Sequence, residues 1–151
     1  MSDAGGDGGQ GSGSGKEGSR GVAPGRFKKP AEPAVVALRM EDLALWAVER
    51  AAKFPREHKF TIGDRWVEAC LDVTTFLVEA SYTRDRGGLL RAASHALTRA
   101  RVLVRMAQRL RLLSADQRTY FAEQSVEIGR MIGGWAGWTR GQADGRVENA
   151  G

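Results

Sequence analysis

The chain has 151 residues, and its 23 Lys and Arg against 18 Asp and Glu give a formal net charge of +5. This length predicts one domain, and an apolar fraction of 42% with only 4 prolines is enough for a globular core. A single cysteine excludes an internal disulfide framework and a zinc site built from cysteines. No apolar run reaches the roughly 18 residues that span a bilayer, and the N-terminus lacks the apolar segment of a secretory signal. The sequence therefore predicts a small, basic, cytoplasmic protein without membrane contact.

The two ends of the chain differ in composition from its centre. Residues 1–33 are rich in Gly and Ser and contain almost no large apolar side chain. Such a segment buries too little surface to offset the entropy lost on ordering, so we expect a disordered tail. A second, polar disordered tail is expected over 141–151, which leaves 34–140 as the folded domain.

Four helices are expected in this domain. The first, over 34–54, follows apolar residues at helical spacing and stops at Pro55. The second, over 62–82, begins after Thr61, which predicts an N-cap because Asp64 follows three residues later.

The third and fourth helices follow clear start signals. The third, over 89–112, comes after a turn at Gly87-Gly88, and the fourth, over 115–138, after a capping-box pattern of Ser114 and Gln117. Short connections make consecutive helices antiparallel neighbours. The predicted fold is therefore all-α, an up-down-up-down antiparallel four-helix bundle with a disordered Gly/Ser-rich N-terminal tail.

The third helix separates apolar from basic residues. Arg101, Arg105 and Arg109 follow one another at four-residue intervals, where like charges repel by a few tenths of a kcal/mol per pair. Since helix stability does not favour such a row, we expect an anion to compensate it. The opposite face is expected to line the bundle with Leu89, Ala93, Ala96, Leu97, Ala100, Leu103, Val104, Ala107 and Leu110.

The excess of positive over negative charge lies in this helix and the loop that precedes it. Residues 84–111 contain eight arginines and one acid, Asp85, a local net charge of +7, so the rest of the chain sums to −2. Arginine makes bidentate contacts with phosphate and carboxylate groups, which favours a nucleic acid or an acidic partner over a merely solvated face. The candidate nucleic-acid-binding residues are Arg84, Arg86, Arg91, Arg99, Arg101, Arg105, Arg109 and Arg111.

Two features predict contacts between subunits. The second helix has more apolar surface than one core face requires, and its additional stripe consists of Val67, Leu71 and Val78. On the fourth helix, Gly129 and Gly133 indicate either the close approach of another helix or fraying of its final turns. An acidic row is available to arginines of the third helix, in the same or a neighbouring subunit, and consists of Glu68, Asp72 and Glu79.

No set of nucleophile, base and orienting residue is recognisable. Cys70 lies mid-helix on an apolar face, where an inert buried thiol is expected. Neither His58 nor His95 follows a glutamate by three residues, the spacing of di-metal sites in helix bundles. We therefore expect no catalytic residues, no metal ligands and no cofactor.

Several segments resemble one known family. They are Lys53-Phe54-Pro55-Arg56, the run Lys59 to Arg65, Leu77-Val78-Glu79-Ala80, the arginine-rich third helix with its end at Ser114, and Ile128 to Trp135. In this order and spacing they are similar to the accessory variability determinant (Avd) family, small four-helix-bundle accessory proteins of diversity-generating retroelements. The resemblance covers about residues 38–138, and the Gly/Ser-rich tail departs from the family pattern.

The resemblance implies a homopentamer with a strongly basic surface that binds the retroelement reverse transcriptase together with nucleic acid, the template-repeat RNA and its cDNA. In that role the protein is not an enzyme but supports adenine-directed mutagenic reverse transcription and retrohoming. Two alternatives stay open. One is a four-helix-bundle protein of the 23S rRNA intervening-sequence type, and the other is a protein-only assembly module whose arginines meet acidic rows across subunits.

Overall fold

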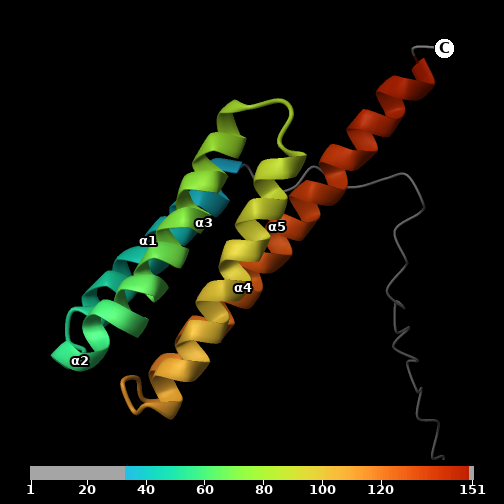
Figure 1. Ribbon diagram of the computed structural model, residues 1–151. Coiled ribbons are helices and arrows are strands. Elements are labelled where there is room, and N and C mark those ends of the chain that lie inside the picture. Colours follow the sequence, from blue (N-terminus) through green and yellow to red (C-terminus); the bar gives the residue numbers. More distant parts are fainter. Residues whose placement is uncertain (1–32, 150–151) are drawn as a thin grey trace, which may run out of the picture.

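The structure, a computed structural model, describes residues 33–149 and consists there of four long helices joined by short connections. These are α1 (Pro33–Ala51), α3 (Asp64–Tyr82), α4 (Gly87–Arg109) and α5 (Ala115–Asn149), with a helical turn α2 (Arg56–His58) and a π-helical turn η1 (Lys59–Gly63) between α1 and α3. Helices consecutive in the chain lie side by side, and α5 closes the arrangement against α1 (Figure 1). The predicted up-down-up-down four-helix bundle is confirmed. The tail predicted for 1–33 lies outside the described residues, except for Pro33 at the start of α1.

The aromatic part of the core lies where α1 passes into α3. Trp66 is fully buried, and its ring centroid lies 6.0 Å from that of Trp46, 6.0 Å from Phe54 and 5.7 Å from Phe121. Aromatic pairs of this kind add about 0.5–1.5 kcal/mol each beyond their buried area. This cluster joins α1, α3 and α5 at one end of the bundle.

The core face of α4 is built mainly from alanine. Small side chains let neighbouring helices approach closely, and α4 is packed against both α3 and α5. Four of its alanines have no exposed surface, namely Ala93, Ala96, Ala100 and Ala107.

The connection between α1 and α3 differs from the predicted loop. Helical backbone resumes at Arg56, directly after Pro55, and continues through α2 and η1 into α3 without a break. The N-cap predicted at Thr61 is therefore wrong. Its hydroxyl donates to the carbonyl of His58, and the backbone N–H of Asp64 is already bonded to carbonyls of η1. The preceding turn provides the acceptors that a capping side chain would otherwise provide.

The turn between α4 and α5 is fixed by local hydrogen bonds. The predicted capping box is confirmed, because the Ser114 N–H donates to Gln117 Oε1 at 3.0 Å and the Gln117 N–H donates to Ser114 Oγ at 3.1 Å. However, α4 ends at Arg109 and not at residue 112, since Arg111 has a left-handed φ of 61°. Leu110 follows the helix end and is 44% exposed, so its predicted place in the core is wrong.

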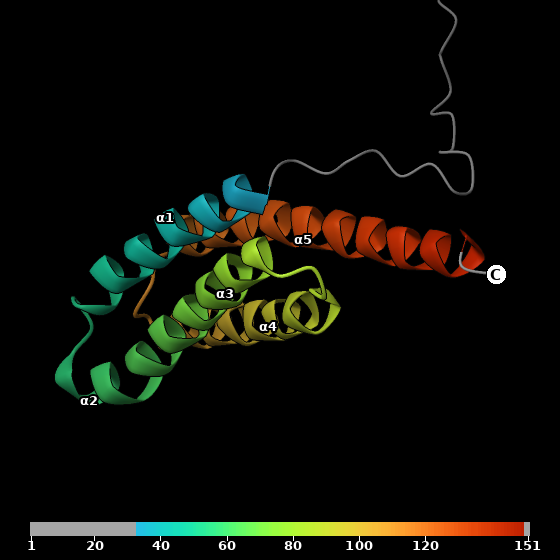
Figure 2. The same cartoon turned by 90° about the horizontal axis from the view of Figure 1, so that it is seen from above.

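The last helix, α5, is longer than predicted and extends past the ends of the other helices (Figure 1 and Figure 2). It continues to Asn149, so that residues 141–149 are helical where the composition predicted a disordered tail. A polar composition leaves the backbone hydrogen bonds intact, and no proline follows Pro55 in the chain to interrupt them. Within the described residues, no helix combines the length and the apolar character needed to span a membrane.

Candidate nucleic-acid interface

The basic face of the bundle follows α4 and the beginning of α5. In an α-helix a step of four residues turns the side chain by about 40°, because one turn takes 3.6 residues. The side chains of Arg101, Arg105 and Arg109 therefore point progressively away from α5 and toward solvent. Arg101 is half-buried, whereas Arg105 and Arg109 are exposed. Three arginines that the sequence predicts as equivalent thus have different surroundings.

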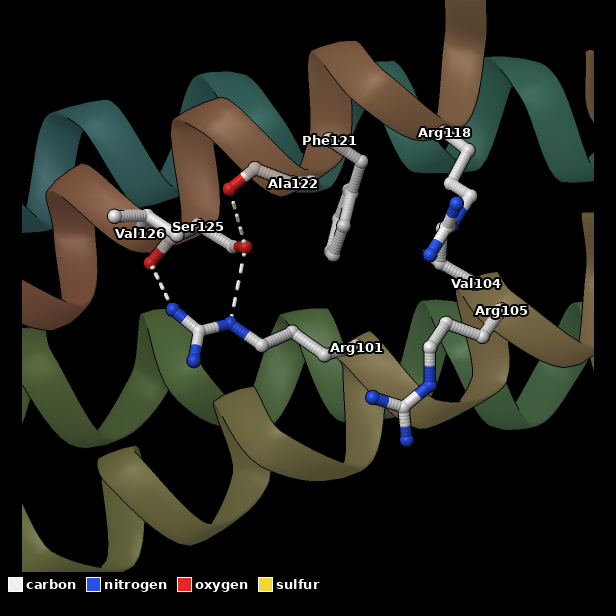
Figure 3. A pocket seen from close by; sticks show the side chains of 8 residues that line it. All are labelled: Arg101, Val104, Arg105, Arg118, Phe121, Ala122, Ser125 and Val126. Carbon is white, nitrogen blue, oxygen red and sulfur yellow. Dashed lines mark hydrogen bonds between the residues drawn. The ribbon is translucent and has the colours of Figure 1, made fainter. Parts of the chain in front are cut away.

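Arg101 is held by α5 (Figure 3). Its Nε donates to Ser125 Oγ at 3.0 Å, and one terminal nitrogen donates to the Ser125 carbonyl at 2.7 Å. Ser125 is fully buried, and its hydroxyl donates in turn to the carbonyl of Ala122 at 3.0 Å. A Cβ on Gly129 would lie 3.1 Å from the same guanidinium, whereas a Cβ on Gly133 would meet nothing within 4 Å. The absence of a side chain at Gly129 therefore makes room for Arg101 of the same chain.

Two neighbouring pockets flank the exposed arginines. The interhelical pocket, of about 200 Å³, is lined by Arg101, Val104, Arg105, Arg118, Phe121, Ala122, Ser125 and Val126. The outer pocket, of about 480 Å³, is lined by Val102, Arg105, Met106, Gln108, Arg109 and Arg118. No carboxylate lines either pocket, and both share Arg105 and Arg118. We call Arg105, Arg109 and Arg118 the arginine ridge.

Arg118 is a member of this surface that sequence reasoning missed. It lies on α5, outside the arginine-rich stretch, and comes close to Arg105 because α5 packs beside α4. Its only signal in the sequence is its position one turn after the capping box at Ser114, which does not show the direction of its side chain. Its place on the ridge depends on how α5 is rotated against α4.

The other predicted arginines have varied surroundings. Arg99 forms an ion pair with Asp72 of α3 at 3.2 Å, so the expected contact between the acidic row and α4 is made within one chain. Both side chains are well exposed, at 60% and 39%, and such a pair contributes at most about 1 kcal/mol. Arg86 donates to the Thr83 carbonyl at 3.0 Å and lies 5.0 Å from the centroid of the Trp135 ring. Three exposed arginines have no ion pair with the side chains of residues 34–145, namely Arg84, Arg91 and Arg111.

Arg111 occupies a backbone conformation that usually belongs to glycine. Its N–H donates to the Gln108 carbonyl at 2.9 Å, and the Leu112 N–H donates to the Ala107 carbonyl at 2.8 Å, the two hydrogen bonds of a Schellman helix end. A residue with a side chain in the left-handed region costs roughly 1–2 kcal/mol.

The apolar residues predicted for subunit contacts lie partly at the surface. On α3, Leu71 is 47% and Val78 is 41% exposed, while Val67 packs against the core. On α1, Leu38 and Leu45 are also exposed, at 61% and 55%. Exposed apolar residues on neighbouring helices are typical of an interaction surface, and the subunit interface stays a prediction.

The single cysteine has an inert environment. Cys70 is fully buried on α3, and this burial raises the pKa of its thiol to about 12. The thiol is therefore neutral at physiological pH. Because only the thiolate is nucleophilic or binds a metal, Cys70 is inert. Where the structure describes side chains, over residues 34–145, no three His, Cys, Asp or Glu side chains are grouped so that they could hold a metal ion.

The fold and this surface define an antiparallel four-helix-bundle protein with an arginine surface along one helix and the start of the next. Comparison with family models matches residues 34–138 to the bAvd-like family. Because the match covers more than half of the chain, the protein belongs to this family, and it is an Avd-type accessory protein. Comparisons with curated proteins and with solved structures gave no match.

Proposed function

We propose that this protein is the non-catalytic accessory factor of a diversity-generating retroelement. It assembles into an oligomer, binds nucleic acid through the basic surface of α4 and docks the reverse transcriptase for mutagenic reverse transcription and retrohoming. Membership of the bAvd-like family supports the accessory role. The observation that carries nucleic-acid binding is the arginine ridge, three cationic side chains beside two pockets that no carboxylate lines.

The exposed arginines of α4 suit the phosphate backbone better than base edges. The 23 residues of α4 make a helix about 35 Å long at 1.5 Å per residue, and its exposed arginines recur along it from Arg91 to Arg109. Contacts with phosphates fix the position of a nucleic acid but carry no sequence information. We therefore expect binding that tolerates many sequences.

Salt dependence tests this proposal. The affinity of the wild-type protein for a 20-nucleotide RNA should fall steeply with salt, by a log-log slope of about −0.7 for each neutralised phosphate of a single strand. Replacing the three residues of the arginine ridge by alanine should flatten the slope by about 2, because up to three phosphate contacts are lost. A control triple variant removes the same charge elsewhere, at the exposed residues Arg39, Arg56 and Arg130.

The control triple variant should keep most of the wild-type slope. Equal slopes for the two triple variants would show that only net charge matters and would contradict the proposed surface. If the ridge variant instead formed smaller particles in light scattering, the arginines would serve the assembly, and the protein-only alternative would be favoured.

Oligomerisation and polymerase docking are tested separately. Replacing Leu71 and Val78 of α3 by glutamate adds charge to an exposed apolar stripe and should give smaller particles without loss of helicity. The wild-type protein should copurify with the reverse transcriptase of its own retroelement. Unchanged particle size in the glutamate variant would place the interface elsewhere.

A further inference from the structure

The interhelical pocket combines an apolar floor with a cationic rim. Val104 and Phe121 form the floor and are only 2% and 1% exposed. Figure 3 shows Arg105 and Arg118 on one side of the Phe121 ring, and Arg101 with its hydrogen bonds to Ser125 on the other. The exposed side chains of Arg105 and Arg118 have no ion pair among the side chains that the structure describes, those of residues 34–145.

The size of this pocket restricts what it holds. Pockets that enclose a whole drug-sized ligand have volumes of about 300–1,000 Å³. The interhelical pocket has about 200 Å³, which suits one planar ring system or one side chain. The occupant must also carry negative charge beside this group, because two guanidinium groups stand at the rim.

The hydrogen-bond donors and acceptors of the pocket indicate whether its occupant is a peptide or a nucleotide. A peptide segment brings backbone N–H donors, which need acceptors when they are buried. The carbonyl and hydroxyl of Ser125 already accept from Arg101, and no carboxylate or amide side chain lines the pocket. A phosphodiester backbone offers only acceptors, which match the arginine donors, and the faces of a base are apolar. The available donors therefore favour a nucleotide.

We infer that the interhelical pocket takes one unpaired base of a bound single strand, with Arg105 and Arg118, on the same side of the pocket, holding backbone phosphates next to it. This inference rests on the proposed function, since it assigns one subsite within the nucleic-acid surface. Base contacts of this kind do not read sequence, because every base has an apolar face. The pocket thus gives the protein a preference for unpaired nucleic acid over duplex.

The test compares a 12-nucleotide strand of deoxyadenosine with an abasic strand that has the same number of phosphates. The wild-type protein should bind the adenine strand about tenfold more tightly, the effect of one well-placed base contact. Ala122→Leu fills the pocket without changing charge or helix propensity, and should reduce this preference to less than about twofold. The salt dependence of binding should stay at the wild-type value. Ala52→Leu, at an exposed alanine of the turn after α1, is the matched control and should keep the full preference.

The outcomes separate this inference from the proposed function. If wild-type protein binds neither strand, the proposed function fails. If it binds both strands equally, or if Ala122→Leu keeps the preference, the nucleic-acid surface stands and the base pocket is refuted. If a polyglutamate peptide competes with the strand in wild type but not in Ala122→Leu, the pocket is a protein-docking site.

A second measurement uses only the wild-type protein, so its result does not depend on whether Ala122→Leu folds. A strand with 2-aminopurine at one unpaired position should be shielded from acrylamide quenching when bound to the wild-type protein. Quenching as strong as in the free strand would overturn the inference.

Discussion

Removing Arg101 should destabilise the bundle, whereas removing Arg105 from the same row should not. Arg101→Ala deletes two hydrogen bonds from a charged group to Ser125, at 3.0 and 2.7 Å. Hydrogen bonds to charged groups contribute about 1.5–3 kcal/mol when buried, but Arg101 is only half-buried, and the loss of one like charge from the row returns a few tenths of a kcal/mol. The expected net loss is about 1–2 kcal/mol.

This loss is measurable by thermal unfolding. For a folded unit of this length, 1 kcal/mol corresponds to about 4 °C, so the Tm of Arg101→Ala should fall by roughly 4–8 °C. Arg105→Ala carries the same charge change one helical turn away and should stay within about 1 °C of wild type. All variants are compared at one protein concentration, because assembly would otherwise shift the Tm.

A double-mutant cycle identifies the partner. Ser125→Ala removes the hydroxyl that accepts from Arg101 Nε. The double variant should therefore lose less stability than the sum of the losses of the two single variants. Equal Tm values for Arg101→Ala and Arg105→Ala would refute the reasoning, since Arg101 would then be as free of the bundle as its neighbour.

Three further predictions concern single residues. Arg111→Gly should raise the stability by about 1 kcal/mol in urea unfolding, because φ of 61° suits glycine, and should weaken RNA binding at low salt; a loss of stability would contradict the strain. Ser114→Ala should lower the stability by about 1 kcal/mol through loss of the capping box, and an unchanged midpoint would show that the cap contributes nothing. Between pH 8 and 10, the free energy of unfolding of the wild type should fall by about 1.4 kcal/mol relative to that of Cys70→Ala. The thiol of the unfolded chain ionises above its ordinary pKa of 9.0, whereas burial raises the pKa of the folded thiol to about 12. Parallel pH profiles of the two proteins would disprove this.

Short sequence motifs predicted a helix end correctly only where no other group bonded to the N–H groups at that end. Ser114 and Gln117 form their capping box because Leu112 has already left the helix, so that the new N-terminus has no other acceptors. Thr61 and Asp64 have similar spacing but follow a helical turn that satisfies the same N–H groups. A short motif does not contain this difference, because it lies in the residues before the motif.

The candidate site was predicted in part. The arginine-rich stretch identified α4, and its core face was correct apart from Leu110 at the helix end and the buried Leu90, which the prediction left out. The separate roles of Arg101 and Arg105 depend on the place of α5, which a helical wheel of α4 alone does not contain. Arg118 was missed for the same reason, since it joins the ridge from another helix.

The fit of Arg101 over Gly129 has a consequence for how this family changes over time. A side chain at position 129 would displace the guanidinium, and a shorter residue at 101 would leave a gap above the glycine. Alanine at 129 requires the guanidinium to shift by a few tenths of an ångström, which opposes the gain in helix propensity over glycine, whereas a small residue at 101 removes this conflict. We expect the two positions to covary among related proteins, so that a side chain at 129 accompanies a small residue at 101.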